Sequence, residues 1–96
     1  MNVGYQILII VSQCTGISIE AIQGKSRYTP IKIARQLVHN YAFRKLNNLT
    51  KVGQLTNNNH STIYNSMRRV LDWGNYDDYK YHIKNIEHKL KQNNLL

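Results

Sequence analysis

Apolar side chains recur every three or four residues along most of the chain, which is the period of an amphipathic α-helix. No segment shows the two-residue alternation of a half-buried strand, so the pattern predicts an all-α fold class. The predicted helices run from Tyr5 to Thr15, Ile19 to Gln23, Pro30 to about Leu46, Asn48 to Thr56, His60 to Leu71 and about Asp77 to Gln92.

The residues at the ends of these segments support their boundaries. Pro30 suits the first helical position, where its missing N–H would have no partner in any case. Gly16 and Gly24 are expected to end the first two helices, and the last five residues, QNNLL, are expected to fray. Three residues have side-chain oxygens that can accept from the first free N–H groups of a helix. These expected N-caps are Ser18, Thr29 and Asn59.

The apolar stripe of each helix predicts the core. The side chains expected inside are Ile7, Ile10, Val11, Cys14, Ala34, Leu37, Val38, Tyr41, Leu46, Leu49, Val52, Leu55, Ile63, Met67, Val70, Leu71, Tyr79, Ile83, Ile86 and Leu90. His39, His82 and His88 are expected on helix surfaces. Cys14 is expected to act as a small buried hydrophobic group rather than as a reactive thiol.

The stretch from Asn57 to Leu71, NNNHSTIYNSMRRVL, joins a polar turn to an amphipathic helix. The polar side of that helix carries Ser61, Tyr64, Asn65 and Arg68, with Arg69 at its boundary. Together with the short helix before it, this stretch predicts a helix-turn-helix whose second helix enters a DNA major groove. An ordinary helical hairpin in a small bundle would show the same pattern.

Length and charge narrow the function. Ninety-six residues suffice for a single domain spanning residues 1–96, with a modest core. Thirteen Lys and Arg against five Asp and Glu give a net charge of +8, which favours nucleic acid over a membrane as partner. A merely soluble basic surface is the alternative. One cysteine, and no segment that resembles a signal peptide or membrane span, lead us to expect a cytoplasmic protein.

The candidate catalytic and cofactor motifs are incomplete. Gly24-Lys25-Ser26 ends like a GxxxxGK[ST] phosphate-binding loop, but Ile19 stands where the first glycine should be. The four histidines form no HxxxH pair, and one cysteine is too few to complete a zinc site. His60 and Ser61 diverge around a helix, with no acid to orient them. We therefore expect a protein that is not an enzyme and has no cofactor, metal or bound nucleotide.

Two sequence motifs lie at a characteristic distance from each other. A basic loop, Lys25-Ser26-Arg27, precedes Ala34-Arg35-Gln36 in the longest helix, and Val52-Gly53 precedes His60-Ser61-Thr62-Ile63. These motifs resemble the C-terminal DNA-binding domain of the bacterial replication initiator DnaA, including its IG…(D)H[ST]T[VI] signature. The segment VSQCTGISIEAIQGKSR also fits the first two helices of that family, so the resemblance covers nearly the whole chain.

The resemblance implies a Trp-repressor-like helical bundle that binds double-stranded DNA as a monomer. It implies that the helix after Asn59 enters the major groove and that the basic loop reaches the adjacent minor groove, with Arg27 as the inserted side chain. His60 and Ser61 match residues that contact base edges. Thr62 and Asn65 match backbone-facing positions, and Lys25 matches a loop residue that touches phosphate. The expected DNA-binding residues are Lys25, Arg27, Tyr28, Thr50, Lys51, Asn58, Asn59, His60, Ser61, Thr62, Tyr64, Asn65 and Arg68.

The sequence also departs from the family pattern. The family usually has Asp where this chain has Asn59, and often Pro where it has Thr50. Asparagine pairs bidentately with adenine, whereas aspartate suits the amino group of cytosine, so Asn59 either changes the preferred base or only caps the helix. The initiator's ATPase and oligomerisation domains have no counterpart in these 96 residues, so ATP-driven origin melting is not expected.

These features lead us to expect sequence-specific DNA binding in transcriptional or replication control, with a phage or mobile element as one source. The alternative is a protein-interaction module in which the same face binds a protein partner. Retention of Arg27 and of His60-Ser61-Thr62 favours DNA, because a repurposed interface need not keep these polar side chains. Structured RNA is disfavoured, since a helix cannot enter the deep, narrow major groove of A-form RNA.

Overall fold

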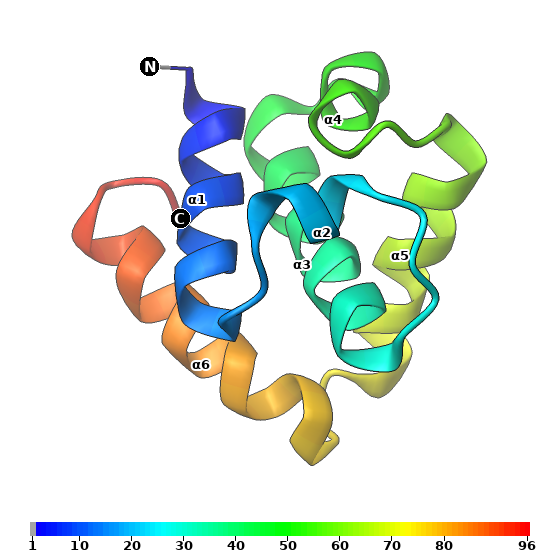
Figure 1. The fold of residues 1–96 in the computed structure, drawn as a ribbon. Coiled ribbons are helices and arrows are strands. Elements are labelled where there is room, and N and C mark those ends of the chain that lie inside the picture. Colours follow the sequence, from blue (N-terminus) through cyan, green and yellow to red (C-terminus); the bar gives the residue numbers. More distant parts are fainter. Residues whose placement is uncertain (1) are drawn as a thin grey trace.

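The computed structural model describes residues 2–96, which form six helices and no strand (Figure 1). The helices are α1 (Val3–Thr15), α2 (Ile19–Gln23), α3 (Thr29–Leu46), α4 (Leu49–Thr56), α5 (His60–Trp73) and α6 (Asp77–Gln92). The all-α prediction is confirmed. Each predicted helix is present, and its ends differ from the prediction by at most two residues.

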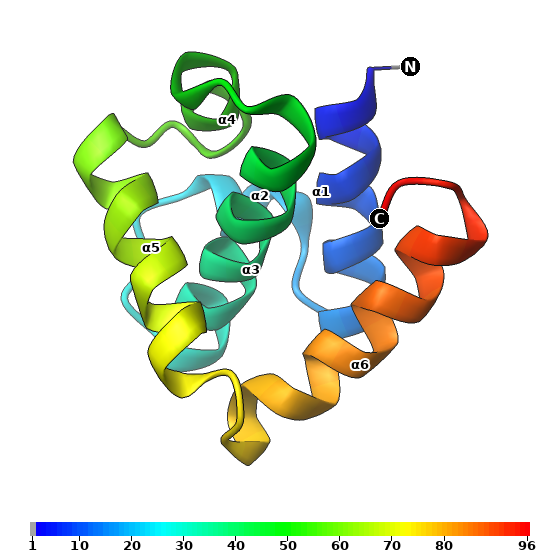
Figure 2. The ribbon, with the colours of Figure 1, turned by 180° about the vertical axis from the view of Figure 1, so that it is seen from behind.

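Helix α3 is the central element of the fold. It makes its most extensive contacts with α1 and α5, while α6 packs mainly along α1. Figures 1 and 2 show α5 and α6 diverging from their junction toward opposite sides of the molecule. The side chains with no exposed surface include Ile7, Leu8, Val11, Ile22, Ala34, Leu37, Val38, Val52, Ile63 and Ile86. Each of the other five helices packs against α3, and α6 also lies along α1. Among residues 2–96, no helix has the length and apolar character needed to span a bilayer.

Two of the three predicted N-caps, Ser18 and Asn59, are confirmed. Ser18 Oγ accepts from the Ala21 N–H at 3.1 Å, and Asn59 Oδ1 accepts from the Thr62 N–H at 2.9 Å. Gly16 ends α1 with a φ of 73°, a left-handed conformation that glycine adopts without steric cost.

Helix α3 begins one residue earlier than predicted. Thr29 is its first helical residue and not its N-cap, and Pro30 is the second. The N-cap position is Tyr28, whose side chain makes no capping hydrogen bond and whose carbonyl accepts from the Lys32 N–H at 3.0 Å. Proline is tolerated there because first-turn N–H groups have no intrahelical acceptor.

The buried side of α5 is rotated from the predicted apolar stripe. Ile63 and Val70 are buried as predicted, but Leu71 is 83% exposed and Ser66 is only 5% exposed. At 3.6 residues per turn, Val70 lies about 20° around the helix from Ile63, whereas Leu71 lies about 80° away. Ser66 is on the inner side, where its hydroxyl hydrogen-bonds to a buried ring nitrogen of His39. The buried side of α5 therefore combines this polar contact with the apolar contacts of Ile63 and Val70.

The end of the chain packs on the core, so the prediction that QNNLL frays is wrong. Asn94 adopts a φ of 57°, and the Leu95 N–H donates to the Leu90 carbonyl at 2.8 Å. The Asn94 N–H donates to the Lys91 carbonyl at 3.2 Å, which completes a Schellman arrangement. This turn directs Leu95 back to the core, where it is 8% exposed.

The turn between α4 and α5 closes against Gly53. The Asn58 N–H donates to the Gly53 carbonyl at 3.1 Å. A Cβ at Gly53 would lie 2.4 Å from the Asn58 carbonyl oxygen, far inside van der Waals contact. The two helices can therefore approach this closely only because position 53 has no side chain.

We expect Gly53→Ala to lower the free energy of unfolding by about 1–3 kcal/mol, the usual cost of forcing extra atoms into a packed site. In an unconstrained helix the same change would stabilise by roughly 0.5–1 kcal/mol, so the sign is diagnostic. Urea denaturation measures it. Gln54→Ala, at the exposed neighbouring position of α4, is the matched control. A stabilised Gly53→Ala protein would show that the close approach is not required.

Candidate nucleic-acid interface

The segment that leads into the basic loop, Lys25-Ser26-Arg27, is hydrogen-bonded to the end of α4 and to the turn of the helix-turn-helix. The Gln23 side-chain amide donates to the Leu55 carbonyl at 2.9 Å, and the Asn57 side-chain amide donates to the Gln23 carbonyl at 3.2 Å. Lys25 Nζ donates to the Asn57 carbonyl at 3.4 Å. Segments more than thirty residues apart in the chain are thereby held side by side.

Arg35 holds the basic loop against α3. Its guanidinium donates to the carbonyls of Ile22 at 2.7 Å, Ala21 at 3.2 Å and Ser26 at 3.1 Å. Two of these carbonyls belong to the short helix α2 and the third to the loop, so one cation satisfies acceptors in both. In the sequence, Arg35 is identifiable only as part of the Ala34-Arg35-Gln36 motif. Its partners lie 9 to 14 residues away, outside any local pattern.

His39 is fully buried beneath the helix-turn-helix, so its prediction as a surface residue is wrong. Its Nδ1 lies 2.7 Å from Ser66 Oγ, and its Nε2 lies 2.6 Å from Thr56 Oγ1. These contacts join the middle of α3 to the last residue of α4 and to the middle of α5. Both hydroxyls are themselves buried. A single-helix pattern could not reveal this site, because the partners are 17 and 27 residues away.

The environment of His39 favours the neutral imidazole. Burial and the Arg35 guanidinium lower the pKa of His39 to about 4, while the Asn58 side chain acts in the opposite direction. At neutral pH one ring nitrogen therefore donates and the other accepts. The hydroxyls of Thr56 and Ser66 can each take either role, so both hydrogen bonds are satisfied.

Eleven of the thirteen predicted contact residues are exposed, and the other two, Asn58 and Thr62, are half-buried. Along α5, Ser61, Asn65 and Arg68 lie on the side opposite the buried Ile63. Arg68 also forms a long, exposed ion pair of 4.0 Å with Asp72, an interaction that contributes little.

The residues predicted on α4 separate into two places. Thr50 Oγ1 lies 3.4 Å from His60 Nε2, and both line the hollow in front of the turn, together with Ser61. Lys51 instead lines a hollow beside Leu46 and the start of α1. The structure therefore groups Thr50 with the start of α5 and leaves Lys51 outside that group.

Asn58 and Asn59 lie at the start of α5. The Asn59 side-chain oxygen caps the helix by accepting from the Thr62 N–H at 2.9 Å, and because an amide oxygen can accept two hydrogen bonds, this cap is compatible with a contact to a base. The Asn58 side-chain oxygen is buried and has no hydrogen-bond partner among the described residues. The role of the half-buried Asn58 in contacting DNA stays a prediction.

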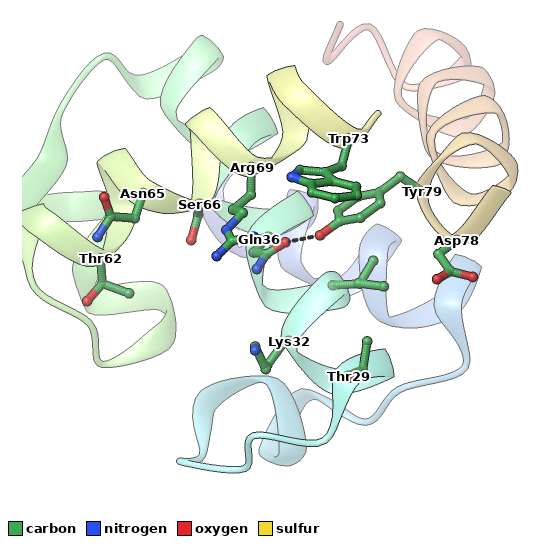
Figure 3. A pocket seen from close by; sticks show the side chains of 11 residues that line it. Thr29, Lys32, Gln36, Thr62, Asn65, Ser66, Arg69, Trp73, Asp78 and Tyr79 are labelled. Atoms are coloured by element: carbon green, nitrogen blue, oxygen red, sulfur yellow. Dashed lines mark hydrogen bonds between the residues drawn. The ribbon is translucent and has the colours of Figure 1, made fainter. Parts of the chain in front are cut away.

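Positive charge is concentrated in the middle of the chain. The segment from Ala21 to Leu71 contains nine of the thirteen Lys and Arg residues and none of the five Asp and Glu residues. Five of these nine cations are not among the predicted contacts, and two of the five, Lys32 and Arg69, line a cleft between α3 and α5 (Figure 3). The absence of acidic residues from this segment is the sequence signal that could have identified Lys32 and Arg69 as candidate contacts.

Within residues 2–96, no group of three or more His, Cys, Asp or Glu side chains is placed to hold a metal ion.

Residues 5–70 match the family model described as bacterial dnaA protein helix-turn-helix. The match contains all thirteen predicted contact residues, whereas α6 lies beyond it. No curated protein and no solved structure matches the chain.

We expect acid to destabilise the protein through His39. The unfolded chain binds a proton at this residue near pH 6.5, whereas the folded protein does so only near pH 4. The free energy of unfolding should therefore fall by up to about 3 kcal/mol as the pH drops through this window, and this contribution should then level off. Urea denaturation at stepped pH measures the change.

His39→Gln retains a donor and an acceptor but cannot titrate, so it should lose most of this pH dependence. His88→Gln, at an exposed position of α6, is the control and should retain it. Burial also lowers the pKa of His82, which leaves a residual slope of the same sign in both variants. An unchanged slope in His39→Gln would contradict the assignment.

Proposed function

The chain belongs to the bacterial DnaA helix-turn-helix family, and we therefore propose that it binds specific sequences in double-stranded DNA. In this proposal the start of α5 enters the major groove and the basic loop enters the adjacent minor groove. The observation that carries it is that the segment leading into the basic loop is hydrogen-bonded to the turn before α5, through Gln23 and Lys25, which both contact Asn57. A helix and a loop held side by side can contact two neighbouring grooves of one duplex.

Each element has a separate proposed role. On α5, His60 and Ser61 contact base edges, while Thr62 and Asn65 face the sugar-phosphate backbone. In the loop, Arg27 is exposed and forms no ion pair with the described residues, so its guanidinium is free to enter a minor groove. Arg35 acts as a positioning residue, because its hydrogen bonds hold the loop in place.

We propose control of transcription or replication as the biological role, by occupying sites on DNA. A phage or mobile element remains the proposed source. The experiment that tests the proposed function most directly is selection of bound sequences from a random duplex pool at physiological salt. Enrichment of one motif supports sequence-specific binding, and recovery of unchanged random sequence contradicts it.

A protein-interaction module is the second candidate. It is favoured by the exposed apolar side chains of Leu71, Trp73 and Tyr76 near the junction of α5 and α6. These residues lie outside the part of the chain that matches the family. A monomer can expose single apolar side chains without a partner, so DNA binding is the better-supported function.

Binding to duplex DNA should depend strongly on salt. If about four to six phosphates are neutralised, log K should fall against log salt with a slope of roughly −4 to −5. Fluorescence anisotropy with a labelled duplex at several salt concentrations measures the slope. A salt-insensitive complex, or no binding at low salt, would favour the protein-interaction function.

Arg27→Ala should weaken binding to the selected site by about 1–3 kcal/mol, the range for one base-reading contact. The preference for A·T pairs should relax on the side of the site that faces the loop, because a cation is favoured in a narrow A·T minor groove. Lys84→Ala, on the exposed side of α6, removes the same charge and should have little effect. If the two variants bind alike, the loop does not occupy the minor groove.

A further inference from the structure

The cleft between α3 and α5 carries two cations without a carboxylate partner. It has a volume of about 390 Å³, and Figure 3 shows Lys32 and Arg69 entering it from opposite helices. Both side chains are exposed, and neither forms an ion pair with a described residue. The polar side chains of Thr29, Thr62 and Asn65 supply further hydrogen-bond donors to the same space.

The start of α3 adds a third positive feature. Tyr28 provides no side-chain cap, and the first turn contains no acidic residue. The first-turn N–H groups of this 18-residue helix therefore keep their partial positive charge, which favours an anion. Helix α6 also lacks a side-chain cap, but Asp77 and Asp78 in its first turn already complement its N–H groups.

The position of the cleft indicates which anion it would hold. Thr29 directly follows the basic loop, and Thr62 lies in the first turn of α5. The cleft therefore lies between the element proposed for the minor groove and the element proposed for the major groove. In a duplex, the strand that separates two neighbouring grooves is a sugar-phosphate backbone, so it must pass between these elements.

We propose that this cleft seats a phosphodiester of the bound duplex, with Lys32 and Arg69 contacting the phosphate from two sides. The inference rests on the proposed DNA binding. Asp78 also lines the cleft, and its carboxylate would repel a phosphate. Figure 3 shows Asp78 at the end opposite Thr62 and Asn65, so the phosphate lies toward Thr62.

The first arm of the test measures salt dependence. Lys32→Ala and Arg69→Ala should each weaken binding roughly five- to tenfold near 0.1 M salt and reduce the salt slope by about one. The selected sequence should remain the same, since a phosphate contact carries no base information. Lys84→Ala is the charge-matched control on α6.

The second arm uses the opposite sign of charge. Asp78→Asn should strengthen duplex binding, because it removes a carboxylate from the cleft. Asp77→Asn changes the net charge equally but lies outside the cleft lining, so it is the matched control. Equal effects of the two variants would indicate a general charge effect and would overturn a local phosphate seat.

The third arm reports on the cleft directly. Trp73 is the only tryptophan of the chain, lines the cleft and is 44% exposed. Duplex DNA should protect its fluorescence from quenching by acrylamide, a neutral probe, whereas inorganic phosphate at millimolar concentration should not. Equal protection by inorganic phosphate would mean a site for free anions and would overturn the backbone seat.

The outcomes separate this inference from the proposed function. If the duplex binds while Trp73 stays equally quenched, and if Lys32→Ala and Arg69→Ala behave like Lys84→Ala, the seat is wrong and DNA binding stands. If no duplex binds at low salt, the proposed function itself fails, and the seat fails with it.

Discussion

The buried hydrogen bonds of His39 are the constraint on which the candidate interface depends. They attach α4 and α5 to the central helix α3 through the hydroxyls of Thr56 and Ser66. Loss of the imidazole would leave two buried hydroxyls unpaired, at a cost of roughly 1–3 kcal/mol each. Ser66 faces His39 while Ile63 and Val70 pack in the core, and these contacts together set the rotation of α5. Leu71 is among the side chains that this rotation leaves exposed.

A second set of polar contacts places the basic loop. Arg35 binds carbonyls of α2 and the loop. Gln23 donates to Leu55 of α4 and accepts from Asn57 in the α4–α5 turn. Since Arg35 and His39 belong to the same helix, α3 positions both of the elements proposed to contact DNA. Their relative placement is therefore a property of the folded protein that exists before any ligand binds. Such preorganisation reduces the ordering cost of association.

The distribution of charge complements this geometry. The acid-free segment from Ala21 to Leu71 includes the loop, α3, α4 and nearly all of α5, whereas four of the five acidic residues follow Leu71. A duplex would accordingly be attracted to one part of the molecule, and the attraction would not depend on sequence. The few uncharged side chains at the start of α5, together with the loop, would then distinguish one DNA sequence from another.

The amino-acid sequence by itself determined the helices, the caps at Ser18 and Asn59, and the helix-turn-helix, because periodicity and capping involve residues within four positions of each other. The sequence also contains the motifs by which the family can be identified. The roles of the thirteen candidate contacts remain predictions. Only the tertiary structure decided that His39 and Ser66 are buried, that Leu95 packs on the core, and that Lys32 and Arg69 share a cleft. The physical reason is distance along the chain. Each of these features except the turn at Leu95 depends on partners at least 17 residues apart, which no local pattern contains.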